Sequence, residues 1–388
     1  MKKLSSRFEN IETGIFALLT HKHNELVSQG RKVYDFFVGT PDFEVDKDIR
    51  DAVCRAVSDP ETYKYSLIDS QEMLDAVVDY YARRFKTEIS ADEVTSSNGA
   101  QDGLCHIGMA MCDPGDVVLL PDPGYPAFEA SAVFGGADVY HYPLLRENNF
   151  LPNMKAIPED VLLKTKYMIV SYPSNPCGAA APREMYEELI GYALKYGFYI
   201  VNDNAYSDII FDGREGFSFL SIPGAKDVGV EFFSLSKSFN LTGARIAFCV
   251  GNKRIVDTLK RVRSQYDLGM FMAVQKAAVA ALHQELEKPQ AQCLKYQERR
   301  DALCSGLREI GWDVPDSAGT MFVWAPIPPK FSSTQEFWEA LVDRTGIICT
   351  PGTAFGPSGE GYVRFALIYS PEELKGLARI IDESGLLK

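Results

Sequence analysis

Residues 231–251 read EFFSLSKSFNLTGARIAFCVG, with two apolar runs on either side of a short polar segment. The runs Glu231–Ser236 and Ile246–Gly251 have the length and composition of β-strands that are buried on both faces. Between them lies Lys237, and Arg245 follows eight positions later. A Ser-Lys-Ser triplet alone is most often ordinary surface, so the role of Lys237 depends on what the rest of the chain places beside it.

Similar apolar runs precede this stretch and alternate with helical segments. The five further runs cover 94–97, 117–121, 138–142, 167–172 and 198–203, and the helices predicted between the runs include 100–112, 124–134 and 182–196. The last of these helices begins after Pro182 and ends near Gly197, as helix start and stop signals predict. The alternation predicts an α/β sheet with helices on both faces.

After about residue 270 the pattern changes to that of a smaller α+β domain. The predicted elements are one long helical stretch over roughly 271–310, strands around 321–327, 347–351 and 362–367, and helices over 333–345 and 371–385. A single core rarely grows beyond about 250–300 residues, so a chain of 388 residues favours two domains. We expect a large domain over 46–270 and a small domain over 271–388, which the N-terminal segment 1–45 joins.

Composition and charge exclude several classes of protein. The chain is 46% hydrophobic and 24% charged, as is usual for a globular protein, and its net charge of −13 argues against nucleic acid or an anionic membrane as partner. The eight cysteines are scattered without a CxxC pair, and the five histidines have no metal-binding spacing. No run of about 18 apolar residues is present, and MKKLSSRFENIETG lacks a signal-peptide core. We expect a cytoplasmic protein without a metal site.

Polar residues follow several of the apolar runs, where open α/β sheets bind their ligands. Asn98-Gly99-Ala100-Gln101 opens a helix, and backbone N–H groups at a helix start suit a phosphate, although a plain tight turn is the more common origin of such a sequence. Asn175 follows the run 167–172 within a turn-forming Asn-Pro pair. Asp203 ends another run, with Tyr206 three residues later; a helix-capping role is the alternative.

These residues together fit a site for pyridoxal phosphate. The aldehyde of this cofactor needs a lysine, here Lys237, to form a Schiff base. Its phosphate needs cationic and hydroxyl donors, which Arg245, Ser234 and Ser236 can supply. Its ring nitrogen needs an anion such as Asp203. The donors to its phenolic oxygen are Asn175 and Tyr206, and Tyr125 either stacks on the ring or belongs to the core.

On these motifs the chain resembles the fold-type I pyridoxal phosphate enzymes, and among them the class I/II aminotransferases. The shared motifs run in family order from Val38-Gly39-Thr40-Pro41-Asp42-Phe43 through Tyr65, Asn98–Gly103, Asp113–Asp116, Tyr125, Asn175, Asp203, Tyr206 and SLSKSFNLTGAR to Pro351–Gly356 and Tyr362-Val363-Arg364-Phe365. The resemblance implies a seven-stranded, mostly parallel sheet flanked by helices, with a smaller α+β domain. It also implies a transaminase that moves an amino group between an L-amino acid and a 2-oxo acid.

The resemblance also implies roles for individual residues. Lys237 would hold the cofactor and act as general base for the proton shift. Ala100, Gln101, Ser234, Ser236 and Arg245 would hold the phosphate, and Tyr65 would reach it from the other subunit of a homodimer with shared sites. Arg364 would bind the substrate α-carboxylate with a bidentate fork, with Asn175 and Gly39 beside it.

The substrate and the outcome of the reaction stay open at this stage. Similar enzymes act on aspartate, alanine or LL-diaminopimelate. The residues expected to face the substrate side chain are Ile15, Phe16 and His21 from the N-terminal segment, and Tyr65 and the 263–272 loop from the other subunit. Arg263 or Lys22 would favour a dicarboxylate, but solvent exposure is the more common state of such residues. The rival functions are a C–S β-lyase with the same cofactor and, less favoured, a non-catalytic cofactor-binding regulator.

Overall fold

In the computed structural model, residues 14–388 are described, and a seven-stranded sheet forms the centre of the larger unit. Its strands are β2 (Val94–Ser97), β3 (Val117–Asp122), β4 (Asp138–Pro143), β5 (Thr165–Val170), β6 (Tyr199–Asn204), β7 (Gly229–Ser234) and β8 (Ala247–Gly251). They lie in the order β2-β8-β7-β6-β5-β3-β4. The prediction of an α/β protein with a seven-stranded sheet is confirmed, and each strand falls within a few residues of its predicted run.

The sheet is parallel apart from β8, which runs antiparallel to both of its neighbours, β2 and β7. Strands β7 and β8 are buried at every position, as strands covered on both faces should be. On one face pack α4 (Ala100–Met111), α5 (Ala127–Gly135) and α10 (Lys253–Tyr266). On the other face pack α3 (Gln71–Tyr80), α7 (Arg183–Tyr196) and α8 (Ala225–Val228), among other elements.

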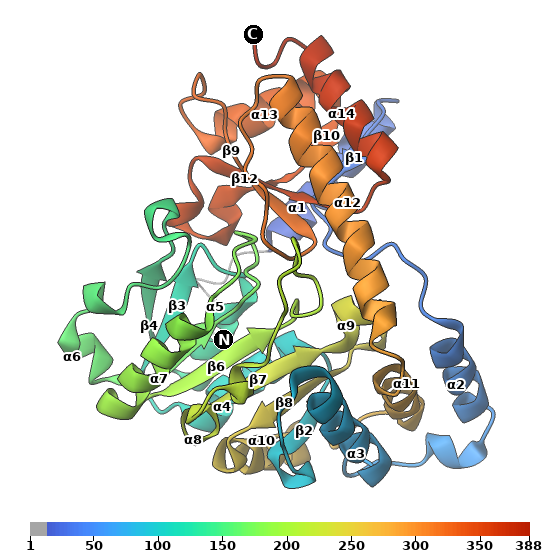
Figure 1. Ribbon diagram of the computed structural model, residues 1–388, viewed down its shortest axis with the longest axis vertical. Helices are drawn as coiled ribbons and strands as arrows, with labels where there is room; N and C mark the ends of the chain where they lie inside the picture. Colours follow the sequence, from blue (N-terminus) through green and yellow to red (C-terminus); the bar gives the residue numbers. More distant parts are fainter. Residues whose placement is uncertain (1–13) are drawn as a thin grey trace, which may run out of the picture.

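The smaller unit lies above the carboxyl ends of the parallel strands (Figure 1). It contains an antiparallel sheet of β9 (Phe322–Pro326), β12 (Tyr362–Ala366) and β11 (Thr350–Pro351), in the order β11-β12-β9. Helices α12 (Glu287–Glu309), α13 (Thr334–Thr345) and α14 (Pro371–Glu383) pack around it. In residues 14–388 no helix combines the length and the apolar character needed to cross a membrane.

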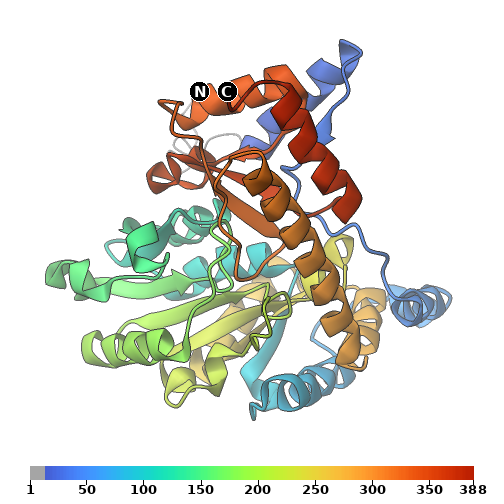
Figure 2. The ribbon, with the colours of Figure 1, turned by 45° about the horizontal axis from the view of Figure 1, so that its top comes forward.

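The first elements of the described chain, which begins at Gly14, contact this smaller unit (Figure 2). Helix α1 (Ile15–Ser28) packs Leu19 and Leu26 against Val342 and Ile348, and β1 (Tyr34–Asp35) pairs in parallel with β10 (Ile347–Ile348). Residues 1–13, part of the predicted 1–45 segment, lie outside the described residues. We propose that the described part of the segment belongs to the small domain.

The stretch predicted as one helix over 271–310 is two helices. Helix α11 (Met272–Leu282) ends at Leu282, and α12 begins at Glu287, so the prediction of a continuous helix is wrong. Helix α11 packs against α2 (Lys47–Val57) and α3 of the larger unit, whereas α12 packs in the smaller one. We therefore propose a boundary between the two domains at residues 283–286 rather than after residue 270.

Candidate active site

The strand ends of the large sheet bring the predicted site residues to one edge. Strands β2, β3, β5, β6 and β7 all end there, because they run parallel. Lys237 lies three residues after the end of β7, Asp203 lies near the end of β6, and Arg245 comes two residues before β8 begins. Since β8 runs in the opposite direction, its first residues lie at the same edge as the last residues of its neighbours.

A cavity of about 360 Å³ opens at this edge. All predicted site residues except Tyr65 line it: Gly39, Ala100, Gln101, Tyr125, Asn175, Asp203, Tyr206, Ser234, Ser236, Lys237, Arg245 and Arg364. The volume is within the range of about 300–1,000 Å³ that is usual for small-molecule sites. Gly39 and Arg364 come from segments outside the large sheet, so the cavity lies where the two units meet.

The Lys237 amine makes one hydrogen bond, to a backbone carbonyl, and forms no ion pair with a carboxylate among the described residues. Its Nζ donates to the Gly39 carbonyl at 2.5 Å. Burial, followed by the nearby positive charges of Arg364 and Arg245, lowers the pKa of Lys237 to about 8, and only Asp203 opposes this shift. Near neutral pH a useful share of this amine is therefore uncharged, as a nucleophile or a general base requires.

Asp203 is a buried carboxylate without a hydrogen-bond partner at Oδ1 among the described residues. Burial raises the pKa of Asp203 to about 7, against the opposing influence of Ser171 and of the Lys237 charge. An unpartnered buried carboxylate costs free energy unless a donor or a cation binds it. Asp203 is thus suited to bind a cationic or protonated group of a ligand in the cavity.

Arg364 is the largest fully buried polar side chain in this cavity, at 1% exposure. Its Nη1 donates to Asn175 Oδ1 at 2.8 Å and its Nη2 to the Phe37 carbonyl at 3.1 Å, while Nε has no partner within residues 14–388. The guanidinium lies 3.9 Å from the centre of the Phe322 ring. Although burial lowers the pKa of Arg364 to about 10, the group stays charged at neutral pH and can bind a carboxylate.

The turn before α4 forms an anion cradle with Arg245. Gly99 has a φ of +89°, and a Cβ at this position would lie 2.4 Å from Arg245 Nη2, so only glycine lets the guanidinium approach the turn. Ala100 and Gln101 follow as the first residues of α4, where backbone N–H groups are free to bind an anion. Ser234 Oγ accepts from the Ser236 backbone N–H at 3.2 Å, and both side chains line the same cavity.

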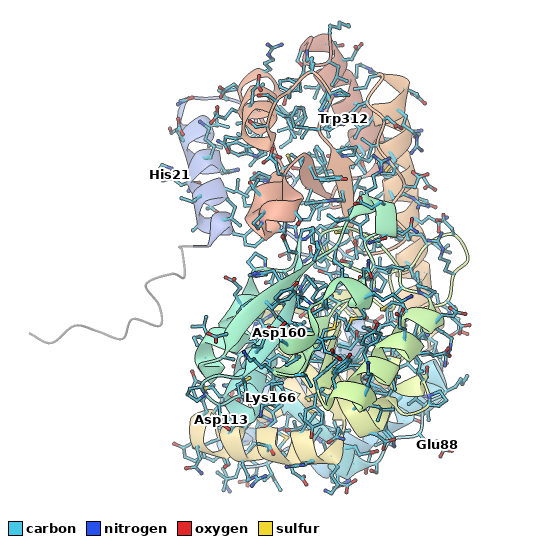
Figure 3. All side chains as sticks on the ribbon, turned by 90° about the vertical axis from the view of Figure 1, so that its left-hand side faces the viewer. His21, Glu88, Asp113, Asp160, Lys166 and Trp312 are labelled. Atoms are coloured by element: carbon cyan, nitrogen blue, oxygen red, sulfur yellow. The ribbon has the colours of Figure 1, made fainter. Side chains whose placement is uncertain are left out.

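The residues expected to face a substrate side chain divide into two groups. Phe16 lines the cavity, whereas His21 is exposed on α1 (Figure 3) and Lys22 pairs with Glu25 at 3.2 Å. Ile15 packs with the α1 cluster around Leu19.

Arg263 is neither a solvated cation nor a residue of the cavity. It is 6% exposed and forms ion pairs with Asp69 and Asp267. It also donates to the hydroxyl groups of Thr95 and Ser96. Both interpretations of Arg263 from the sequence are therefore wrong. Of its two carboxylate partners, Asp267 lies one helical turn away, but Asp69 lies 194 positions away in the chain.

Tyr65 lies outside this cavity and is 86% exposed. It lines a separate hollow with Tyr63, Met270 and Phe271, and several other large apolar side chains are exposed nearby. Leu67 and Ile68 are 63% and 80% exposed. A run of exposed apolar side chains of this kind is typical of a surface that contacts another protein chain.

Some cavity residues were not predicted from the sequence: Thr20, Phe37, Leu104, Ala205, Thr242 and Phe322. Thr20 had a signal, because it lies one helical turn after Phe16 on α1 and therefore shares its face. Phe322 had none, since it belongs to β9 of the smaller unit and reaches the cavity only through the packing of that unit.

One group of possible metal ligands occurs within residues 14–388, at Asp102, His106 and Asp267. Its carboxylates already have protein partners, because Asp267 accepts from Arg263 and Asn98, and Asp102 accepts from the Asn98 backbone N–H. We assign no metal to it.

The cavity fits pyridoxal phosphate on features of its own. Asp203 supplies the anion that a ring nitrogen needs, and Lys237 supplies a primary amine of lowered pKa. The Gly99 turn, Arg245 and the two serines supply donors for a phosphate. Tyr125 lines the wall, with its hydroxyl donating to Gln101 Oε1 at 3.1 Å.

Comparison with known proteins agrees with this donor set. Residues 31–381 match the family described as aminotransferase class I and II. The chain is 41% identical to LL-diaminopimelate aminotransferase of Dehalococcoides mccartyi, with 98% of each chain covered, and 40% identical to that of Aquifex aeolicus over the full length of both. Among solved structures it is similar to substrate-bound BacF of Bacillus subtilis, with a TM-score of 0.94, 31% identity, and 99% and 98% of the two chains covered.

Proposed function

We propose, because this chain belongs to the class I and II aminotransferases, that its catalytic residue is Lys237 and that its substrates bind between Lys237 and Arg364. The protein is a transaminase that depends on pyridoxal 5'-phosphate and acts on amino acids and 2-oxo acids. The β-lyase and the cofactor-binding regulator therefore find no support. The observation that carries the proposal is the buried amine of Lys237 in one cavity with the unpartnered carboxylate of Asp203.

The cofactor would be held by three sets of residues. Asp203 would bind the ring nitrogen, and Asn175 and Tyr206 would donate to the phenolic oxygen. The phosphate would be bound by the start of α4 at Ala100 and Gln101 and by Ser234, Ser236 and Arg245, and Tyr125 would cover the ring. When bound, this cofactor supplies an electron sink for the negative charge that develops when an amino acid loses its Cα proton.

Lys237 Nζ would take that proton from the substrate Cα and hold it as the ammonium, from which the 1,3-proton shift would deliver it to the cofactor rather than back to the substrate. A pKa of about 8 suits both halves of this task, because the amine is neither fully protonated nor too weak a base near neutral pH. The 2.5 Å contact with the Gly39 carbonyl orients Nζ at the cavity wall.

Arg364 would orient the amino acid by its α-carboxylate. Its Nη1 and Nη2 are already fixed by Asn175 and Phe37, so the guanidinium is preorganised, and Nε has a donor left to offer. For the amino donor we propose LL-diaminopimelate or a similar amino acid, since two relatives at 41% and 40% identity over nearly the whole chain are named LL-diaminopimelate aminotransferase.

The assignment of Lys237 is tested by reduction of the holoenzyme with borohydride followed by peptide mass spectrometry. We expect the cofactor to be fixed on the peptide that contains Lys237, and we expect Lys237→Ala to lose both the labelled peptide and amino transfer. A cofactor fixed on another lysine, or full turnover by Lys237→Ala, would contradict the assignment. A screen of L-amino acids and LL-diaminopimelate, followed by the change in cofactor absorbance, tests the substrate.

We also propose a homodimer in which Tyr65 of each subunit reaches the phosphate site of the other. The support is the exposed apolar surface around Tyr63, Tyr65, Leu67, Ile68 and Phe271. Mixed dimers of Lys237→Ala and Tyr65→Ala subunits test this arrangement. If Tyr65 acts across the interface, one site of each mixed dimer contains both intact residues, and activity returns on mixing. If Tyr65 acts within its own chain, no site is complete and mixing restores nothing.

A cytoplasmic location is the last part of the proposal. All eight cysteines are free thiols, as is usual in a reducing compartment. Recovery of the protein in a periplasmic or secreted fraction would contradict this location.

A further inference from the structure

A second and larger cavity, of about 1,130 Å³, lies on the other side of the Asn175–Gly178 segment from Lys237. Asn175 lines the active site, whereas Cys177 and Gly178 line this second cavity, which we call the outer groove. Residues of both units form its walls, among them 177–183 and 214–217 from the larger unit and 315–318 from the smaller one. No residue to which we assign a catalytic or cofactor-binding role lines it.

Aromatic rings form one part of the outer groove. Tyr362 and Trp324 stack with ring centres 5.1 Å apart and planes inclined by 9°, and Phe150 packs edge-on against Tyr362 at 6.1 Å. Phe217 lines another wall. Tyr362, Phe150 and Phe217 are only half-buried, so their rings remain available to a ligand. Flat apolar molecules gain most from such walls, because stacking adds to the burial of their surface.

Positive charges surround these rings. The outer groove is lined by Arg84, Lys86, Arg146, Arg183 and Arg214, and by only two carboxylates, Glu215 and Asp316. Arg84 is neutralised by Asp208 at 2.7 Å, and Asp316 is neutralised by Arg308 at 2.9 Å.

The remaining four cations form no ion pair with a carboxylate in the described residues. Arg183 donates to the hydroxyl and the carbonyl of Ser221 and lies over the Phe217 ring, and Lys86 donates to the Arg83 carbonyl. Glu215 is then the one unpaired anion among the described lining residues, against four unpaired cations.

This local excess of positive charge is opposite in sign to the net charge of the whole protein. With a net charge of −13, a random surface hollow would be acidic, so a hollow with four unpaired cations concentrates anions. Guanidinium groups bind carboxylates and phosphates in a forked geometry, and three of the four cations are arginines. Cations on the rim and half-buried rings on the walls are complementary to a molecule that has an acidic end and a flat apolar body.

We propose that the outer groove is a second ligand site, which binds an aromatic organic anion bearing a phosphate or carboxylate group. The phosphate or carboxylate contacts Arg146 and Arg214, and the ring lies against Tyr362, Phe150 and Phe217. The site is separate from the amino acid site, because Arg364 and Lys237 belong to the other cavity.

The test is a titration of the holoenzyme with 1-naphthyl phosphate and with 1-naphthoate, followed by calorimetry and by the fluorescence of Trp324. We expect saturable binding of at least one of the two, one molecule per chain, with quenching that Trp324→Phe removes. Inorganic phosphate and 1-naphthol, each half of the first probe, are expected to bind at least about tenfold more weakly, since each lacks one set of contacts.

Two variants separate this site from others. Arg146→Ala/Arg214→Ala is expected to weaken binding about tenfold or more, because both side chains are exposed and their loss leaves the fold intact. The matched control Arg379→Ala, an exposed arginine on α14, and the active-site variant Arg364→Lys are expected to bind as the parent does. The proposal is wrong if neither probe saturates, if the double variant binds unchanged, if inorganic phosphate binds equally well, or if Arg364→Lys abolishes binding.

Discussion

Replacement of Arg364 by lysine isolates the forked hydrogen bonding of this side chain from its charge. Both residues are cations at neutral pH, but a lysine ammonium cannot donate to Asn175 and Phe37 and also offer a donor to a substrate carboxylate in one plane. A hydrogen bond to a charged group contributes about 1.5–3 kcal/mol, and each 1.4 kcal/mol is tenfold. We therefore expect Arg364→Lys to lower kcat/KM for the amino donor by about 10- to 150-fold.

The assay is a stopped-flow half-reaction, in which the absorbance of the bound cofactor is followed at increasing amino acid concentration. We expect the apparent KM to rise while cofactor content and its spectrum stay unchanged, because Arg364 is assigned to the substrate and not to the cofactor. The matched control is Arg300→Lys, another buried arginine, which lies on α12 of the smaller unit, forks onto Asp212 and lies over the Phe211 ring. An equal loss in both variants, or an unchanged KM in Arg364→Lys, would refute the role given to Arg364.

The remaining predictions concern the cofactor site and the buried ion pairs. The pKa of Asp203 in the folded protein, about 7, lies above its ordinary value of 3.8, so the charged carboxylate destabilises the cofactor-free protein as the pH rises. The stability gained by Asp203→Asn should therefore grow by about 2 kcal/mol from pH 5.5 to 7 and then level off, as measured by thermal unfolding. A gain that did not change with pH would contradict the burial of this charge. The same variant should bind the cofactor more weakly. Gly99→Ala should weaken cofactor binding by about tenfold through its clash with Arg245, whereas Gly115→Ala, with a similar φ of +97° and open space around it, should not. Arg263→Ala should lower the free energy of unfolding by about 3–5 kcal/mol in urea titrations without changing substrate preference. Arg254→Ala, on the same helix, should change neither the free energy of unfolding nor the substrate preference.

The strands of the large sheet and most residues of the cavity could be predicted from the sequence, because both depend on local sequence patterns. A run such as FCVG in β8 is apolar at consecutive positions, and Lys237 and Asp203 follow directly from such runs in the chain. The break between α11 and α12 was missed because residues 283–286, HQEL, contain neither glycine nor proline. Pro289 in the first turn of α12 was the available signal for a new helix start.

Contacts between distant segments could not be predicted in this way. The burial of Arg263 depends on Asp69, and the entry of Phe322 into the cavity depends on how the smaller unit packs. Neither arrangement leaves a pattern near the residue itself. The outer groove could not be predicted from the sequence either, because Arg146, Arg214 and Tyr362 come together only in the folded chain.

The reversed direction of β8 has a consequence for how this enzyme tolerates change. A parallel neighbour of β7 would require the chain to cross back over one face of the sheet, usually through a helix. Because β8 is antiparallel, the 12 residues of 235–246 join it to β7 at one edge of the sheet, and both Lys237 and Arg245 lie within this connection. Their spacing is therefore set by two paired strands rather than by helix packing. Insertions should be accepted in many surface loops of this protein, but a residue added between Ser234 and Lys237 would displace the amine, and a residue added between Arg245 and Ala247 would displace the phosphate anchor.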